Sequence, residues 1–450
     1  MKNKYSILMM LIWAMGVIFP IYSQAQDRVV FTLEESIRYA LENNVEIRNA
    51  LLDNAAAKAT IGERRSEGLP QINATISANH NVIVPVNPFP AIFFDENAPA
   101  DEFIGIGFAP AFTTNMAATV SQMIFNGSYF VGLRAARTFR QLSDFDRVKT
   151  EIDVVENVKK AYYSVLVNEE REELITANLS RIDTLLAETS ILFDEGFAER
   201  IDVSRIKVQS NNLRAELERA MTATVVSKQL LKLQMGLPVN LTMILDEEIA
   251  VLENDLEIEL LLQEQGQRRI EIDQLNTTLE LAHLDLRNNQ VQYLPRLDAN
   301  FTYQRNTFGS TIPTMFRNEW FPGAILGVTL QIPIFDGLLK SYRIQQNRVQ
   351  LRQLQNQKEF LQDNIEVEKF QAKSNLQNSL NTLEVQRENR ELALEVFNIS
   401  KIKFQEGVGS NLEVVDADAA LKEAENNYFG ALFDALIAKV DLEKALGILK

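Results

Sequence analysis

Four segments of the chain place an apolar side chain at every second position. The positions between them carry mostly Gly, Thr, Ser, Asn and Gln. A period of two is typical of a β-strand with one apolar and one polar face, and strands of this length match the wall of a transmembrane β-barrel. A pair of soluble hairpins on a hydrophobic core would show the same period, so the pattern alone leaves both open. The predicted strands are about 71–84, 113–125, 296–306 and 323–335.

Two long tracts, 111–237 and 334–450, contain none of the twelve prolines. Proline breaks helix interiors, and these tracts are rich in Leu, Glu, Gln, Ala, Asn, Lys and Arg, so helices can run through them. Glutamate–glycine pairs at 195–196 and 406–407 predict turns, because glycine accepts the positive φ of a helix end. Helices this long, about 100 Å at 1.5 Å per residue, are typical of coiled coils or tubes. The predicted helices are 128–194, 199–235, 338–405 and 411–447, with two shorter ones near 33–67 and 268–293.

The order of these elements repeats, which indicates an internal duplication. Pro70 has its counterpart in Pro295, 225 residues later, and Gly196 has its counterpart in Gly407, 211 residues later. The shorter second offset places about 15 extra residues in the first copy, around 85–110. The expected division is repeat 1 at 26–236, a linker at 237–267 and repeat 2 at 268–450.

The first 25 residues have the pattern of a secretory signal peptide. Lys2 and Lys4 precede the apolar stretch 7–19, and small residues lead to a cleavage site after Ala25. We expect a signal peptide at 1–25 in preference to a short membrane anchor. The whole chain has 45 basic and 61 acidic residues; loss of the two lysines leaves 43 basic residues and a net charge of −18.

The composition argues against several classes of function. The chain has no cysteine and only two histidines, which disfavours metal sites and histidine-based acid–base catalysis. The acidic charge disfavours a nucleic-acid surface. The acidic residues are expected to lie along the helices as solvated faces, and His80 and His283 are expected to pack or to lie on the surface. We therefore expect no enzyme, no cofactor, no metal and no nucleic-acid partner.

Four amphipathic strands cannot shield their own edges in lipid. Unpaired backbone groups there cost several kcal/mol each, so several chains would have to share one closed barrel. Two copies give eight strands, and a barrel of eight strands has an interior filled with side chains. Three copies give twelve strands and an aqueous lumen, which the long helices would continue as a tube of coiled-coil pairs.

Three stretches of sequence carry a resemblance to a known family. They are the end of the last predicted strand, 328–337 (VTLQIPIFDG), the second turn with the helix start that follows it, 407–417 (GVGSNLEVVDA), and the closing Ala-Leu-Gly at 445–447. Together with the duplication, they make the chain resemble the TolC-like outer-membrane efflux proteins. These are the outer components of tripartite efflux pumps and type I secretion systems.

The resemblance implies an α+β membrane protein of the outer membrane. Its fold would be a trimeric 12-stranded transmembrane β-barrel, with four strands per chain, continued by a long α-helical coiled-coil tunnel in the periplasm. The linker 237–267 would form part of the belt around this tunnel. The implied partners are two further copies of the chain, outer-membrane lipid, a periplasmic adaptor and an inner-membrane pump. The protein would be a passive exit channel for small molecules or secreted polypeptide, gated at its periplasmic end.

Acidic residues follow each predicted turn, at the start of the next helix. Asp202 follows the first turn, and Glu413 and Asp416 follow the second. Carboxylates at a helix start interact favourably with the helix dipole, by about 0.3–1 kcal/mol, and spacing alone favours this structural role. The resemblance instead implies that the three acids line the constriction at the tunnel mouth. There, carboxylates from three chains would attract cations and repel anions.

The two turns are expected to contribute in two further ways. The resemblance implies that relatives hold the mouth closed with a Tyr and an Arg, and this chain has Phe404 and Gly409 at those positions, without a side-chain donor. Closure is therefore expected to be weaker here. The turns would also meet the tip of the adaptor's helical hairpin. The residues expected at this docking tip are Gly196, Phe197, Gly407 and Val408.

Two other functions fit parts of the sequence. A periplasmic coiled-coil adaptor also has long helices, but it would carry one hairpin between small β-domains, whereas this chain has two helix–strand units. A secreted hydrolase using paired carboxylates would need a Ser, a His or a metal ligand beside them, and no predicted cluster has one. Drugs, peptides, secreted protein or metal ions would all pass the expected wall, and the ten Met form no cluster that would indicate a metal path.

Overall fold

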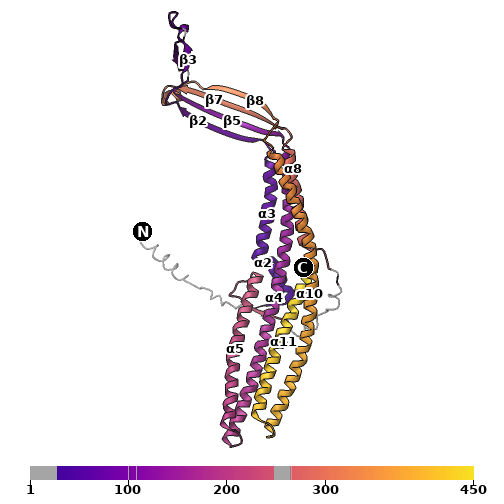
Figure 1. Ribbon diagram of the computed structural model, residues 1–450. Helices are drawn as coiled ribbons and strands as arrows, with labels where there is room; N and C mark the ends of the chain where they lie inside the picture. Colours follow the sequence, from indigo (N-terminus) through magenta and orange to yellow (C-terminus); the bar gives the residue numbers. More distant parts are fainter. Residues whose placement is uncertain (1–27, 100, 108, 248–263, 265, 450) are drawn as a thin grey trace, which may run out of the picture. The chain divides into compact units, whose positions relative to one another are not determined.

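Figure 1 shows the computed structural model, which describes residues 28–449 except 100, 108, 248–263 and 265. The signal peptide expected at 1–25 lies outside the described residues. So does most of the linker expected at 237–267.

The chain divides into two compact units, and each combines segments of both repeats. We call them the helical unit and the strand unit. The repeat boundaries expected at 236 and 268 are therefore not boundaries between compact units, because the two longest helices run through both. The helical unit is Met1–Ile47, Ile152–Gln265 and Gln371–Lys450, and the strand unit is Arg48–Glu151 and Gly266–Phe370.

Four long helices form the tracts that lack proline. The last of them ends at Ala445, two residues before the expected 447, because Gly447 has a φ of 71° and leaves the helical conformation. Among the residues that the structure describes, no helix is both long enough and apolar enough to cross a membrane. The four helices are α4 (Gly127–Asp194), α5 (Arg200–Met235), α10 (Leu339–Gln405) and α11 (Asn411–Ala445).

The helix expected near 33–67 is two helices, α2 (Leu33–Asn43) and α3 (Val45–Ser66). The prediction of one continuous helix is wrong because Asn44 has an extended backbone and uses its side chain locally. Asn44 Oδ1 accepts the N–H of Glu46 at 2.7 Å, and Asn44 Nδ2 donates to Gln234 O at 2.7 Å. The break therefore fastens the start of the chain to the end of α5. The corresponding helix of the second repeat is α8 (Ile270–Val291).

The strand unit contains one four-stranded antiparallel sheet with the order β2-β5-β7-β8. Its members lie side by side in Figure 1, two from each repeat, so the sheet joins the two copies. Within one chain, β2 and β8 are its edges. The strands are β2 (Gln71–His80), β5 (Phe112–Phe125), β7 (Arg296–Gly309) and β8 (Phe321–Gln331).

Strand β2 ends at His80, four residues before the expected 84. Asn81 turns the chain there: its backbone N–H donates to Ala111 O at 2.8 Å, and its Nδ2 donates to Pro110 O at 2.9 Å. These bonds take up the polar groups that would otherwise continue the ladder. A side-chain bond of this kind cannot be read from a period of two.

The strands of the second repeat are also displaced from the prediction. Strand β7 continues past 306 to Gly309, because β5 starts early enough to pair with its last residues. Strand β8 begins at Phe321 rather than 323 and ends at Gln331 rather than 335. Its end lies two residues before Pro333, which has no N–H to donate to a neighbouring strand.

The register separates the two faces of the sheet. Apolar residues are paired across it, as in Val120 with Phe301 and Phe301 with Leu326. Polar residues are paired on the other face, where Thr119 and Thr302 lie 3.0 Å apart through their hydroxyls. The side chains of β2 and β8 are mostly exposed on both faces. In a single chain the sheet therefore leaves much of both faces exposed and has two open edges, although Thr114 and Thr307 are buried.

Several short elements were not expected from the sequence. The strand that opens the described chain pairs in parallel with a strand after α5, and a hairpin with a short helical turn occupies the inserted segment of the first repeat. A short helix precedes β8. These elements are β1 (Arg28–Phe31), β6 (Thr242–Leu245), β3 (Asn87–Pro90), η1 (Ala91–Phe93), β4 (Phe103–Ile106) and α9 (Ile312–Arg317).

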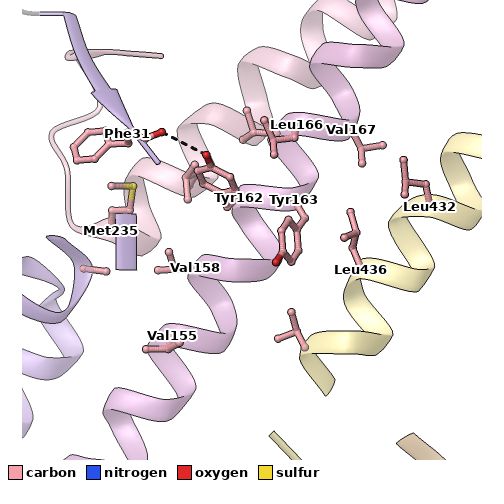
Figure 2. Close-up of a cluster of buried hydrophobic side chains, with 14 of the residues drawn as sticks. Phe31, Val155, Val158, Tyr162, Tyr163, Leu166, Val167, Met235, Leu432 and Leu436 are labelled. Carbon is pink, nitrogen blue, oxygen red and sulfur yellow. Dashed lines mark hydrogen bonds between the residues drawn. The ribbon is translucent and has the colours of Figure 1, made fainter. Parts of the chain in front are cut away.

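The largest core of the helical unit, which we call the central core, joins α4 to both ends of the chain. Phe31 comes from β1, Met235 from α5 and Leu432 from α11, and all three belong to the same buried cluster as Tyr162 of α4. Figure 2 shows the Tyr162 hydroxyl donating to Phe31 O, at 3.4 Å. The core thus fixes β1 and α11 on one helix. Its other labelled members in Figure 2 are Val155, Val158, Tyr163, Leu166, Val167 and Leu436.

Candidate functional site at the helical tips

The turn between α4 and α5 is built around Gly196, whose φ is 79°. The N–H of Phe197 donates to Leu192 O at 2.7 Å, and the N–H of Gly196 donates to Phe193 O at 3.0 Å. These are the bonds that close a helix through a left-handed glycine. The turn presents Phe197 to solvent, with 81% of its surface exposed.

The turn between α10 and α11 has the same design, as the duplication predicts. Gly407 has a φ of 75°, and the N–H groups of Val408 and Gly409 both donate to Lys403 O at 3.0 Å. Val408 is 79% exposed. The two turns lie at the same end of the helical unit (Figure 1). Each repeat therefore presents a highly exposed apolar residue directly after the glycine of its turn.

The three acids proposed for the mouth lie within the first two turns of α5 and α11. Asp202 Oδ2 accepts the backbone N–H of Glu199 at 3.2 Å, so Asp202 caps the start of α5. The start of α11 is capped instead by Ser410, whose hydroxyl accepts the N–H of Glu413 at 3.3 Å. The side chains of Glu413 and Asp416 are exposed. Asp202 therefore caps its own helix, whereas the described residues show no such bond to the carboxylates of Glu413 and Asp416.

The two positions at which relatives are expected to hold the mouth closed, Phe404 and Gly409, differ in their surroundings. Phe404 is half-buried against a second hydrophobic cluster, which we call the tip core. A side chain at Gly409 would meet Lys403, with its Cβ 2.9 Å from the Lys403 Cβ and 3.1 Å from its carbonyl carbon. Gly407, rather than Gly409, has the positive φ. The tip core consists of Ile182, Leu185, Ile206, Leu213, Phe397, Val414, Ala417 and Leu421.

Beside the tip core lies a group of polar residues that the sequence analysis missed. Asp418 and Glu425, both on α11, are only 3% and 5% exposed. Asp418 Oδ2 accepts Gln209 Nε2 at 2.8 Å, and Glu425 Oε2 accepts Asn178 Nδ2 at 2.7 Å. Arg181 Nη2 lies 3.9 Å from Asp418 Oδ1. We call these five residues the buried acid cluster.

Both carboxyls of the buried acid cluster have raised pKa values. Burial raises the pKa of Asp418, although the hydrogen bond from Gln209 and the charge of Arg181 act in the opposite direction. Burial likewise raises the pKa of Glu425 against the hydrogen bond from Asn178, and the negative charge of Asp418 adds to the rise. The physical cause is that a charged carboxylate loses its hydration in the interior.

The expectation that acidic residues lie on solvated helix faces is wrong for Asp418 and Glu425. A signal for their burial exists in the sequence, because the two acids are seven residues apart and so lie on one face of α11. Each follows an alanine, Ala417 or Ala424, that belongs to the buried side of the helix. An acid that recurs at this spacing beside small apolar residues indicates a buried position.

The two histidines and the acids suggest no metal centre. The ring of His80 stacks on Phe112 with the ring centroids 4.2 Å apart. Within the part of the chain that the structure describes, no three His, Asp or Glu side chains gather as a metal site requires.

The sequence matches the model of one protein family, described as "Outer membrane efflux protein", over residues 36–237 and 261–448. The chain belongs to this family. The two matched segments correspond to the two repeats, and the family is one of transport channels rather than of enzymes. The efflux protein is therefore an outer-membrane channel, as the resemblance implied, and the alternative of a periplasmic adaptor finds no support.

Individual relatives agree with the family. The outer membrane protein TolC of Vibrio cholerae is 21% identical over 93% of this chain and 91% of its own length. The pyoverdine export outer membrane protein OpmQ of Pseudomonas aeruginosa is 23% identical over 92% of this chain and 85% of its own.

The fold agrees as well. A crystal structure of CusC, a protein that forms a transmembrane channel, superposes with a TM-score of 0.71 at 16% identity, covering 92% of each chain. The expected fold class is confirmed: the efflux protein has the α+β architecture of these channels, with barrel strands and tunnel helices. The residues assigned to the mouth, to its closure and to the docking tip stay predictions.

Proposed function

We propose that three copies of this efflux protein close one 12-stranded barrel and form an exit channel with a carboxylate-lined periplasmic mouth. The support for the trimer is the sheet of the strand unit. Its edge strands β2 and β8 pair with no further strand among the described residues, and many of its apolar side chains, such as Phe301 and Leu326, are exposed. In lipid, the unpaired backbone groups of an open strand edge would be strongly destabilising. Pairing of β2 from one chain with β8 of the next removes both edges.

The absence of cysteine allows a direct test of this trimer. Pairs of single cysteines, one along β2 and one along β8, should give disulfide-linked species of two and three chains and nothing larger. The control is Asn115→Cys with Asn306→Cys, which lie opposite each other on β5 and β7 and should link within one chain. A ladder that stops at two chains, or a soluble monomer, would refute the trimer.

The mouth is supported by the exposed carboxylates at the start of α11. Glu413 and Asp416 follow the tip turn, have no structural bond through their carboxylates that the structure describes, and would stand close to their copies in a trimer. Like charges gathered in a narrow, poorly hydrated opening attract counter-ions strongly. The channel should therefore prefer cations, and di- or trivalent cations added from the periplasmic side should block it.

Single-channel recording in planar bilayers tests the mouth. The double variant Glu413→Ala/Asp416→Ala should lose most of the cation preference and most of the block, with the trimer intact. A matched control is Glu423→Ala/Asp434→Ala, which removes two exposed acids further along the same helix. If the first variant keeps the selectivity of the wild type, the constriction lies elsewhere and the two acids serve only the helix start.

The exposed residues of both tip turns support docking to a periplasmic adaptor of an inner-membrane pump. Phe197 and Val408 are apolar, lie at equivalent positions of the two repeats and are exposed at the end of the helical unit. Positive φ at Gly196 and Gly407 fixes the turns that present them. An exposed apolar residue on a rigid turn is suited to insertion between the helices of a partner hairpin.

Substitution of the tip residues tests docking. Phe197→Glu with Val408→Glu should abolish efflux in cells and adaptor capture, while trimer and membrane levels stay unchanged. The control Val82→Glu alters an equally exposed apolar residue that lies after β2, in the strand unit. Bulky substitution at Gly196 or Gly407 should have the same effect as the double variant. Efflux that survives both kinds of change would place docking on another surface.

A further inference from the structure

The buried acid cluster joins the two helical hairpins of the chain. Arg181 and Asn178 on α4 and Gln209 on α5 belong to the first hairpin, and Asp418 and Glu425 on α11 belong to the second. The hydrogen bonds of 2.8 and 2.7 Å that reach the two acids both cross between the hairpins. Both hydrogen bonds must break when the part of α11 that carries Asp418 and Glu425 moves away from α4 and α5.

Positive charge in the cluster does not match the negative charge at close range. Arg181 contacts Asp418 only at 3.9 Å, and its Nε finds no acceptor among the described residues. Lys422 on α11 acts on Asp418 but is itself paired with Glu216 of α5, and Arg390 on α10 acts on Glu425 through its charge alone. An ionised carboxylate in this position therefore lacks a full countercharge, and burial without one is costly.

We propose that Asp418 and Glu425 form a proton-sensitive clamp that holds the hairpin α10–α11 against the hairpin α4–α5. In the protonated state the clamp is closed, because each neutral acid keeps its hydrogen bond and no longer needs a countercharge. In the ionised state the packed arrangement is penalised and the hairpins separate more readily. The clamp itself is inferred from the contacts between the hairpins. Its effect on the width of the channel mouth depends in addition on the proposed function.

The sign of the pH dependence follows from the raised pKa values of both acids in the packed state. Separated hairpins return the carboxyls to water and to their ordinary pKa values, so the packed state binds more protons than the separated state. A falling pH therefore favours packing, and this contribution is lost as the pH rises through the raised pKa values. Each unit by which one pKa is raised changes the equilibrium tenfold.

Distances between spin labels can measure the clamp in the full-length protein. Because the chain has no native cysteine, Phe197→Cys and Val408→Cys place one label on each tip turn. Assemblies in which one chain carries both labels, studied between pH 4 and pH 8, should show a short, narrow distance distribution at low pH and a longer, broader one at high pH. A distribution that does not change with pH would overturn the proposal.

Neutral isosteres separate the clamp from other titrating groups. Asp418→Asn with Glu425→Gln keeps an acceptor for Gln209 and Asn178 but cannot ionise, so it should show the low-pH distribution at every pH. The matched control is Asp434→Asn with Glu423→Gln, which removes two exposed acids of the same helix and should respond like the wild type. A pH response that persists in the Asp418/Glu425 variant assigns the effect to other groups and refutes the clamp.

A second variant shifts the transition rather than removing it. Arg181→Gln takes away the nearest positive charge, which should raise both pKa values further and move the transition to higher pH. A shift to lower pH would contradict the proposal. Because distances are read on the purified protein, loss of cation selectivity or of adaptor binding would leave this result unchanged, so the clamp and the proposed channel mouth fail independently.

Discussion

Helix α11 contacts the first hairpin in two stretches that differ in how closely their acids are paired with bases. Near its C-terminal end, Lys444 pairs with Asp153 and Glu156 of α4, and Lys160 of α4 pairs with both Glu156 and Asp441. Acids and bases alternate there across the interface. Nearer the tip, the buried acid cluster offers two carboxylates and one close guanidinium. In the first stretch every acid lies within 3.0 Å of a lysine and the groups stay partly hydrated, whereas the second stretch is buried and its acids have no base so close.

The difference shows how one helix can be firmly fixed at one end and adjustable at the other. Burial alone would raise the pKa of Glu156, but hydrogen bonds from Lys160 and Lys444 outweigh it and lower that pKa. The stability contributed by Glu156 is therefore present above its ordinary pKa and is lost only as the pH falls through the lowered one. Acid thus weakens the C-terminal stretch while it strengthens the stretch near the tip.

The largest expected effect is the loss of central-core packing under the C-terminal stretch. Leu432→Ala should lower the free energy of unfolding of the helical unit by about 2–5 kcal/mol, because the buried leucine leaves a cavity. Urea unfolding followed by far-UV circular dichroism measures it. The loss should be the same at pH 5 and pH 8. Leu412→Ala, at an exposed position of the same helix, should change the free energy by less than about 0.5 kcal/mol.

A smaller effect is expected when the ion pairs of the C-terminal stretch are broken. Glu156→Gln removes the negative charge that Lys160 and Lys444 share and leaves one acceptor oxygen where each ammonium now has its own, which should cost about 1–3 kcal/mol at pH 7. The cost should shrink as the pH falls below the ordinary pKa of a glutamate and through the lowered pKa of Glu156. The exposed Glu173→Gln on the same helix is the control. A cost that grows on acidification would mean that Glu156 is not held ionised by its partners.

The comparison is sharpened when the stretch near the tip is given a matching charge. Gln209→Lys places an ammonium where an amide now donates to Asp418, so the pKa of Asp418 should fall and stability should change by about 1 kcal/mol or less. The pH response of the spin-label distances should be halved or lost. Val208→Lys adds the same charge at an exposed neighbouring position and should leave the response intact.

The smallest effect is expected at the tip turns. Gly196→Ala and Gly407→Ala each place a side chain at positive φ, but neither Cβ would meet an atom within 4 Å. Each should cost about 1 kcal/mol of local stability, measured by hydrogen exchange in the last turn of α4 or α10. Equal costs would show that both repeats close their hairpins in the same way, and a difference above about 1 kcal/mol would disprove this equivalence.

Much of this molecule could be predicted from sequence because its signals are local. The proline-free tracts, each divided by a glycine at 196 or 407, mark the long helices. The period of two marks the strands. Strand ends depended instead on tertiary bonds such as that of Asn81, which involve residues distant in sequence. Asp418 and Glu425 were missed because a charged residue on a helix is usually solvated, and only contacts from α4 and α5 make these positions buried.

The parallel pairing of β1 with β6 has a consequence for the order of folding after export. Arg28 pairs with Thr242, and Phe31 of the same strand belongs to the central core. Strand β1 can therefore complete its pairing only once the chain as far as Leu245 is present. Contacts so distant in sequence form slowly. Until then β1 lacks its hydrogen-bonded partner, so the pairing that holds the N-terminal strand on the central core should form late in folding.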